Sequence, residues 1–163
     1  MSDGPFSGGC QCGAVRFRVE RLGGSGVCHC RMCQKAFGNF YAPLVSSFGV
    51  TWTRGAPAWF QSSDKVRRGF CAACGTPLVY EQLGRPVDGS LEIAVGAFDE
   101  PRVAAPTFQL NPRDKQPFVD GIPALPMRTA GEQPEHEAFK ASVVTYQHPD
   151  HDTSVWPEAR HHG

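Results

Sequence analysis

The stretch that decides the fold is GGCQCGAVRFRVE, residues 8–20, in which a pair of cysteines stands directly before a strand pattern. Cys10 and Cys12 are spaced C-x-C, which brings two sulfurs close enough to share a metal ion. From residue 13 to residue 20 apolar and charged residues alternate. Such alternation predicts a β-strand with one buried and one exposed face.

Two further cysteine clusters follow along the chain. Cys28, Cys30 and Cys33 are spaced C-x-C-x-x-C, and Cys71 and Cys74 are spaced C-x-x-C. The seven cysteines are an odd number, so a complete disulfide framework is excluded. Spacings this short suit metal chelation better than cross-linking, so the clusters predict metal sites.

The first and last clusters together supply four ligands for one closed tetrahedral zinc site. We expect Cys10 and Cys12 on extended backbone, with Cys71 and Cys74 on a tight turn that ends at Gly75 with a positive φ. Such a site clamps a long loop, and structural zinc contributes on the order of 10 kcal/mol to folding. This set is therefore predicted to be structural.

The middle cluster supplies three sulfurs, from Cys28, Cys30 and Cys33. Three thiolates leave one coordination position for water or a substrate thiol, which makes these residues the candidate catalytic site. An alternative is that a histidine completes this site and that both metals are structural. His29 is expected to point to the opposite face of the chain and to pack there.

Fourteen prolines and eighteen glycines predict many turns and few, short helices. A short helix is predicted over residues 31–37, with Gly38 ending it, and a flexible turn over residues 23–26. Apolar stretches of strand length, separated by turn residues, predict a mostly antiparallel β domain. The predicted strands span residues 13–20, 40–45, 50–53, 58–61, 69–71, 78–83 and 91–95.

Beyond Glu100 prolines recur every few residues, which predicts an arm or irregular cover and no further sheet. One more short helix is predicted over residues 135–143. The predicted division is a zinc-binding domain over residues 1–127 and a C-terminal extension over residues 128–163. This extension packs as an arm or forms a loose His-rich tail, in which His148 and the histidines after it are expected to be solvated.

The formal charge is zero, with 16 basic and 16 acidic side chains and no basic run, so no nucleic acid is expected as a partner. No apolar stretch approaches the roughly 18 residues of a membrane span, and the first residues are polar, so no membrane partner or signal peptide is expected. Clustered thiols suit a reducing compartment, which predicts a cytoplasmic protein. Oligomeric state is not indicated by the sequence.

Three segments carry a family resemblance: GGCQCGAVR at residues 8–16, CHCRMCQK at residues 28–35 and FCAACGTPL at residues 70–78. Together with IAVGAFDEP at residues 93–101, they resemble the glutathione-dependent formaldehyde-activating enzyme and centromere protein V family. The resemblance extends from about residue 8 to residue 126 and accounts for every cysteine.

The resemblance implies a β-tent fold of antiparallel sheets with two Zn²⁺ ions, held by the same two cysteine sets. It also implies a carbon–sulfur lyase that adds a small-molecule thiol such as glutathione to a small aldehyde such as formaldehyde, or reverses that addition. Arg31, Lys35, Arg67 and Arg68 are candidates to bind the carboxylates of glutathione. The alternatives are a non-catalytic, zinc-stabilised binding module for a protein partner, and sequestration of aldehyde without turnover.

Overall fold

The computed structural model describes residues 2–84 and 88–155. These residues group into two compact units. One contains the chain up to Lys115 together with the described residues from Gln147 onward, and the other spans Gln116–Tyr146. The domain division at residue 127 stays a prediction, and the last part of the predicted His-rich tail lies outside the described residues.

The described residues are mostly β-strand with few short helices, which confirms the predicted fold class. The strands are β1 (Ser2–Gly9), β2 (Arg16–Cys28), β3 (Ala42–Phe48), β4 (Thr51–Arg54), β5 (Ala58–Ser63), β6 (Val66–Phe70), β7 (Pro77–Gln82), β8 (Leu91–Ala94) and β9 (Phe108–Leu110). The helices are α1 (Arg31–Phe37) and α2 (Pro134–Ser142), with 3₁₀ turns at Val95–Ala97, Pro101–Ala104, Pro112–Asp114, Pro117–Ala124 and Ala130–Glu132.

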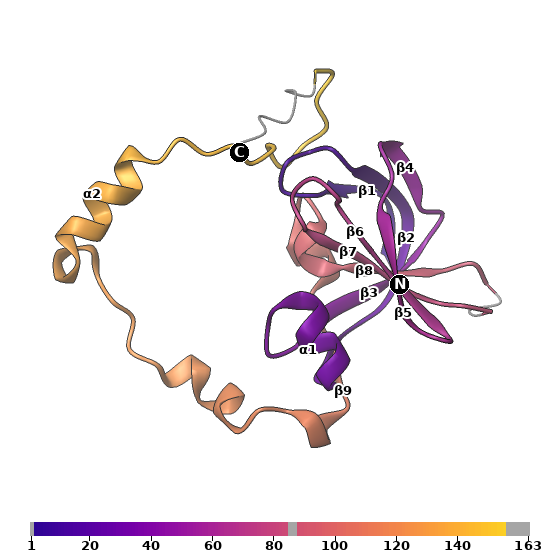
Figure 1. Ribbon diagram of the computed structural model, residues 1–163, viewed down its shortest axis with the longest axis horizontal. Coiled ribbons are helices and arrows are strands. Elements are labelled where there is room, and N and C mark those ends of the chain that lie inside the picture. The colour runs from indigo at the N-terminus through magenta and orange to yellow at the C-terminus, as the bar shows by residue number, and fades with distance from the viewer. Residues whose placement is uncertain (1, 85–87, 156–163) are drawn as a thin grey trace. The chain divides into compact units, whose positions relative to one another are not determined.

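The strands labelled in Figure 1 form one sheet. Their order is β1-β2-β3-β8-β7-β6-β5. Every pair along this order is antiparallel. In addition, β4 pairs with β2 in antiparallel fashion, and β9 pairs with β2 in parallel. β2 is thus bonded to four other strands and organises the sheet.

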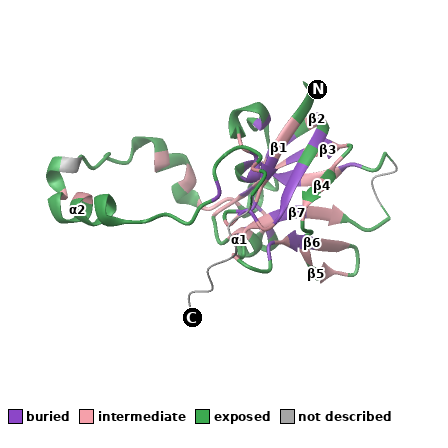
Figure 2. Ribbon diagram, turned by 90° about the horizontal axis from the view of Figure 1, so that it is seen from above, coloured by how far each residue is buried: buried purple, intermediate pink, exposed green. Residues whose placement is uncertain are grey.

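The core lies along β2, whose buried residues are purple in Figure 2. Phe17 and Val19 are fully buried, and Phe17 packs edge-on against Trp52 and Phe98 at centroid distances of 5.9 and 5.3 Å. The alternation predicted for residues 13–20 is therefore confirmed for the apolar face. Arg16 departs from it, since its guanidinium is buried between carboxylates.

The flexible turn predicted at residues 23–26 is wrong, because β2 continues through these glycines to Cys28. Glycine is required here because two aromatic rings occupy the space of a side chain. A Cβ on Gly26 would lie 2.3 Å from the ring of Phe108, and one on Gly23 would lie 3.1 Å from Phe48. The pairing of β2 with β3 shifts register between Leu22 and Ser25, as at a β-bulge.

The prediction that no sheet follows Glu100 is also wrong. β9 adds to β2 in parallel, with Gly26 opposite Phe108 and Cys28 opposite Leu110. The prolines of this region flank β9 and leave its three residues free to pair. This strand brings residues more than 80 positions downstream beside the middle cysteine cluster.

Both predicted helices are present, at Arg31–Phe37 with Gly38 as a left-handed cap at φ 57°, and at Pro134–Ser142. No helix in the described ranges is both long enough and apolar enough to cross a membrane.

The residues from Gln147 to Thr153 belong to the same unit as the sheet. The expectation that His148 is solvated is wrong, since only 5% of it is exposed. Its backbone N–H donates to the Gln11 carbonyl at 2.7 Å, and its ring lies against Gly13, where an added Cβ would meet it at 2.2 Å. The C-terminal segment therefore covers the backbone around the first cysteine pair.

Candidate metal centres

The four-sulfur set is assembled by two turns that the fold brings together. The N–H of Gly13 donates to the Cys10 carbonyl at 3.0 Å, so this pair sits on a turn and not on the extended backbone that we expected. Cys71 and Cys74 sit on the predicted tight turn, in which Gly75 has φ +75° and donates to the Cys71 carbonyl at 2.8 Å.

The spacing of these sulfurs fits a tetrahedral metal site. All four Sγ atoms lie within 4.8 Å of one another, with Cys10–Cys12 at 3.6 Å and Cys12–Cys71 at 3.8 Å. Four sulfurs at about 2.3 Å from one zinc ion stand about 3.8 Å apart. The set thus has the donor chemistry and the dimensions that zinc requires.

Hydrogen bonds already favour negative charge on part of this set. Val15 N–H donates to Cys10 Sγ at 3.3 Å, and the Thr76 hydroxyl lies 3.1 Å from Cys74 Sγ. Burial raises the pKa of Cys10, Cys12 and Cys71. Burial also acts to raise the pKa of Cys74, but hydrogen bonds from Thr76 and Cys12 outweigh it and lower that pKa to about 6.

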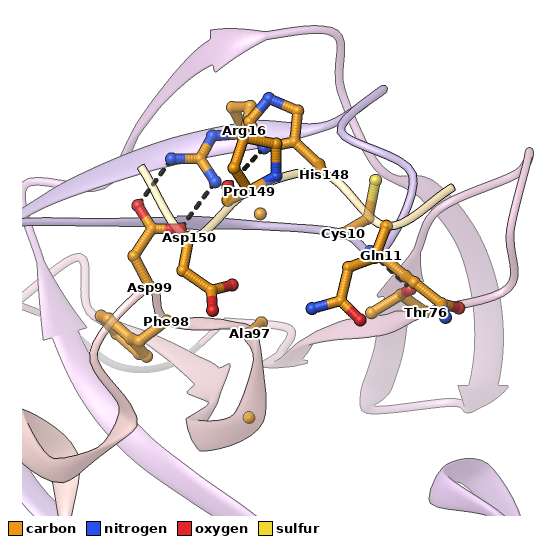
Figure 3. A pocket seen from close by; sticks show the side chains of 13 residues that line it. Cys10, Gln11, Arg16, Thr76, Ala97, Phe98, Asp99, His148, Pro149 and Asp150 are labelled. Atoms are coloured by element: carbon orange, nitrogen blue, oxygen red, sulfur yellow. Dashed lines mark hydrogen bonds and ion pairs between the residues drawn. The ribbon is translucent and has the colours of Figure 1, made fainter. Parts of the chain in front are cut away.

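Polar side chains surround a pocket beside Cys10 (Figure 3). The N–H of Gln11 donates to the Thr76 hydroxyl at 3.0 Å, which ties the two cysteine turns together. A cavity of about 170 Å³ lies beside Cys10, under His148 and next to Arg16. Its small volume leaves little room for an organic substrate.

The three-sulfur set lies where β2 ends and α1 begins. Cys28 is the last residue of β2, Cys30 caps α1 by accepting from the Cys33 N–H at 3.4 Å, and Cys33 lies in the first turn of α1. Their Sγ atoms lie within 4.8 Å of one another. Asn111, which adopts a left-handed conformation at φ 54° after β9, donates its side-chain amide to Cys28 Sγ at 3.1 Å.

The three thiols are unequal in acidity. Burial acts to raise the pKa of Cys28, but the Cys30 N–H and the Asn111 amide outweigh it, so the pKa is lowered. Burial raises the pKa of Cys33 to about 12, against a hydrogen bond from Arg68. A cation among the three sulfurs offsets the cost of a buried Cys33 thiolate, so this donor set also fits zinc.

A cavity of about 620 Å³ opens on the three-sulfur set. All three of its cysteines line the cavity, together with apolar and polar side chains from five strands. A volume of this size can enclose a ligand as large as a tripeptide. The two sulfur sets therefore differ in the cavity beside them: of the four-sulfur set Cys10 alone lines the cavity of about 170 Å³, whereas all three cysteines of the other set line the cavity of about 620 Å³.

His29 has the packing role that we expected. It is 1% exposed, its Nε2 lies 2.9 Å from Gln109 Oε1, and its ring meets Tyr41 edge-on at 5.9 Å. Within residues 2–84 and 88–155, the His, Cys, Asp and Glu groups close enough to share a metal ion are the two cysteine sets alone. No histidine is therefore placed to complete the three-sulfur set.

The four basic candidates separate into three environments. Arg68 is buried and reaches Cys33 Sγ with Nη2 at 3.5 Å. Arg31 and Lys35 line a neighbouring cavity of about 410 Å³ that Arg68 also lines. Arg67 points away from both, since it pairs with Glu81 at 2.6 Å and stacks on Trp59.

Two residues of these centres escaped the sequence analysis, namely Thr76 and Asn111. Thr76 directly follows the Cys71–Gly75 turn, whereas Asn111 lies 83 positions from Cys28 and no spacing rule connects the two. An asparagine before a proline is a turn signal, and this signal alone could have marked Asn111.

Comparison with known proteins places these centres in a family. A family model described as glutathione-dependent formaldehyde-activating enzyme matches residues 5–113, which include every cysteine. A crystal structure of a Rhodobacter sphaeroides protein is similar to this chain at a TM-score of 0.51 and 23% sequence identity. The similarity covers 63% of this chain and 98% of that chain, and supports the fold alone.

Proposed function

Because the chain belongs to the glutathione-dependent formaldehyde-activating enzyme family, we propose that it is a zinc-dependent carbon–sulfur lyase. It joins a glutathione-like thiol to a small aldehyde such as formaldehyde, or reverses that reaction. Cys28, Cys30 and Cys33 form the catalytic centre, and the four-sulfur set holds a structural zinc ion. The reaction takes place in a reducing, cytoplasmic setting.

The observation that carries the proposal is the difference in access between the two sulfur sets. Cys28, Cys30 and Cys33 line a cavity of about 620 Å³, whereas the cavity of about 170 Å³ beside the four-sulfur set is lined by one of its cysteines, Cys10. A structural zinc site is closed by four protein ligands, and a catalytic one keeps a position for substrate. Three sulfurs facing a ligand-sized cavity match the second kind of site.

Zinc bound by three thiolates supplies one chemistry, which is to keep a thiol at its remaining position deprotonated at neutral pH. The chain holds the sulfurs for this purpose. The Cys30 cap fixes the first turn of α1, and Asn111 and Arg68 donate hydrogen bonds to Cys28 and Cys33. These donors spread the negative charge of the sulfurs and keep them in place.

In the proposed reaction the thiol loses one proton and the aldehyde oxygen gains one. The thiol releases one proton to water and the resulting thiolate forms a bond to the aldehyde carbon. The electron pair of the C=O π bond moves to oxygen, and this alkoxide takes up one proton from water. The cavity walls contribute by holding the two reactants together and by excluding competing water from the carbon.

The non-catalytic binding module is the second candidate, and one observation favours it. The unit Gln116–Tyr146 exposes large apolar side chains, a surface typical of protein contacts. They are Phe118, Leu125, Met127, Phe139, Val143, Val144 and Tyr146.

Exchange NMR between formaldehyde and S-hydroxymethylglutathione tests the proposal with the zinc-loaded protein. We expect zinc-dependent acceleration of the exchange, lost in Cys30→Ser. The same variant is also examined for fold and metal content. Cys30→Ser should keep a native near-UV circular dichroism spectrum and about half of the zinc. An exchange rate equal to the uncatalysed rate with fully loaded protein would reject the lyase and leave the binding module.

A further inference from the structure

Four strands place a row of polar side chains across the floor of the 620 Å³ cavity. Ser46 on β3 stands opposite Glu92 on β8, Glu92 stands opposite Tyr80 on β7, and Tyr80 stands opposite Arg68 on β6. Residues directly opposite one another in a sheet point to the same face, so all four side chains share this floor. The row ends at Arg68, which touches the three-sulfur set.

Arg68 has hydrogen-bonding capacity that the protein leaves unused. Its Nη2 donates to Cys33 Sγ at 3.5 Å and its Nε donates to Ser62 Oγ at 3.2 Å. Its Nη1 is buried and has no hydrogen-bond partner within the described residues, where the only other such atom is Nδ1 of His29. A buried donor without an acceptor destabilises the folded protein, so a ligand acceptor at this position offsets that cost.

Tyr80 lies next to this guanidinium and adds a second donor. The Arg68 Cζ stands 5.0 Å from the centroid of the Tyr80 ring, which fixes both side chains. The phenol oxygen accepts a long hydrogen bond from Gln82 at 3.4 Å. Its own proton has no acceptor among the hydrogen bonds of the described residues, and the residue lines the cavity.

We propose that Arg68 and Tyr80 form an oxyanion site that binds the carbonyl oxygen of the second substrate and the alkoxide formed from it. This inference rests on the proposed function. As the sulfur–carbon bond forms, negative charge grows on that oxygen, and both donors hydrogen-bond to it more strongly than to the carbonyl. The alkoxide then takes its proton from cavity water, and the proton released by the thiol restores the balance.

The neighbouring arginine provides a matched control. Arg67 lies on the opposite face of β6, where it pairs with Glu81 and stacks on Trp59. Arg67→Gln therefore removes the same charge from the same strand without touching the cavity. Arg68→Gln and Tyr80→Phe each remove one of the proposed donors.

The kinetic test uses these variants with full zinc loading. Loss of a single oxyanion donor lowers kcat by roughly 10²–10³. We therefore expect such a loss in Arg68→Gln and in Tyr80→Phe, with an unchanged KM for the thiol, and wild-type kinetics in Arg67→Gln. A kcat within twofold of wild type in both cavity variants would overturn the oxyanion site while leaving the lyase intact.

A binding test keeps the inference falsifiable without turnover. Formate presents a carboxylate oxygen of the right kind, and its binding to zinc-loaded protein can be followed by isothermal titration calorimetry. We expect binding to weaken at least tenfold in Arg68→Gln, less in Arg68→Lys, and not at all in Arg67→Gln. If formate binds elsewhere or does not bind, the titrations of Arg68→Gln and wild type will be equal, and the oxyanion site is overturned. Arg68-dependent binding without catalysis would reject the lyase and retain the site.

Discussion

The two carboxylates around Arg16 give a prediction whose size follows from their burial. The Arg16 side chain is 4% exposed and donates to Asp99 through both Nη1 and Nη2, at 2.7 and 2.6 Å. Asp152 in the C-terminal segment accepts from the same guanidinium at 2.8 Å and from the exposed Arg18 at 2.8 Å. Asp99→Asn and Asp152→Asn therefore each remove one of the two negatively charged partners of the same buried guanidinium.

The expected losses of unfolding free energy differ about threefold. Asp99 is 12% exposed, and breaking a buried ion pair typically costs about 3–5 kcal/mol because the remaining charge stays buried. We expect about 3 kcal/mol for Asp99→Asn, since Asp152 still faces Arg16. Asp152 is 36% exposed, and pairs at that exposure contribute up to about 1 kcal/mol, so Asp152→Asn should cost about 1 kcal/mol.

Urea unfolding of the zinc-loaded protein at fixed free zinc measures both losses, with tryptophan fluorescence as the signal because Trp52 packs against Phe17. Glu100→Gln is the control, since its pair with Arg102 is solvent-exposed and should leave the midpoint unchanged. Equal losses in the two Arg16 variants, or a larger loss in Asp152→Asn, would refute the view that Asp99 is the main counter-charge.

Three further outcomes are expected. Gly13→Ala should expose the C-terminal segment to proteases, because its Cβ would lie 2.2 Å from the His148 ring; Gly84→Ala carries a similar φ (74° against 77°) with no such contact, and equal cleavage of both would contradict this. Burial raises the pKa of Glu92 from 4.5, so the folded state keeps this proton to higher pH and stability falls as the pH rises through the folded pKa. Glu92→Gln should therefore raise the melting temperature at pH 7 more than at pH 5, and a larger gain at pH 5 would reverse the assigned sign. Removal of metal by a chelator should abolish the near-UV circular dichroism spectrum, and an unchanged spectrum in metal-free protein would show that the fold does not need the four-sulfur site.

Local signals made much of the fold and both sulfur sets predictable. The helix Arg31–Phe37 and its Gly38 cap follow from residues adjacent in sequence, and so does the Gly75 turn. Grouping the cysteines required only that four close one tetrahedral site and three remain. The helix, its cap and the Gly75 turn depend on short-range geometry, and the grouping of the cysteines depends on the number of ligands that zinc needs.

What sequence reasoning missed depends on long-range pairing. The glycines at 23–26 indicate a turn in isolation. They form strand because this segment pairs with β3 and, about 82 positions later than Gly26, with Phe108 of β9. Alternation separates Arg67 from Arg68, but which of the two faces the sulfurs is decided by the pairing of β6 with β7. His148 is polar and near the chain end, and its burial follows from a surface that Gly13 leaves open.

The central claim is that four sulfurs hold the fold and three hold a reactive metal. Zinc content measured together with near-UV circular dichroism in Cys28→Ser and in Cys71→Ser tests it most directly. We predict that Cys28→Ser stays folded with about half of the wild-type zinc and no activity, and that Cys71→Ser does not fold. If Cys28→Ser also unfolds, the three-sulfur set is structural and the proposed division is contradicted.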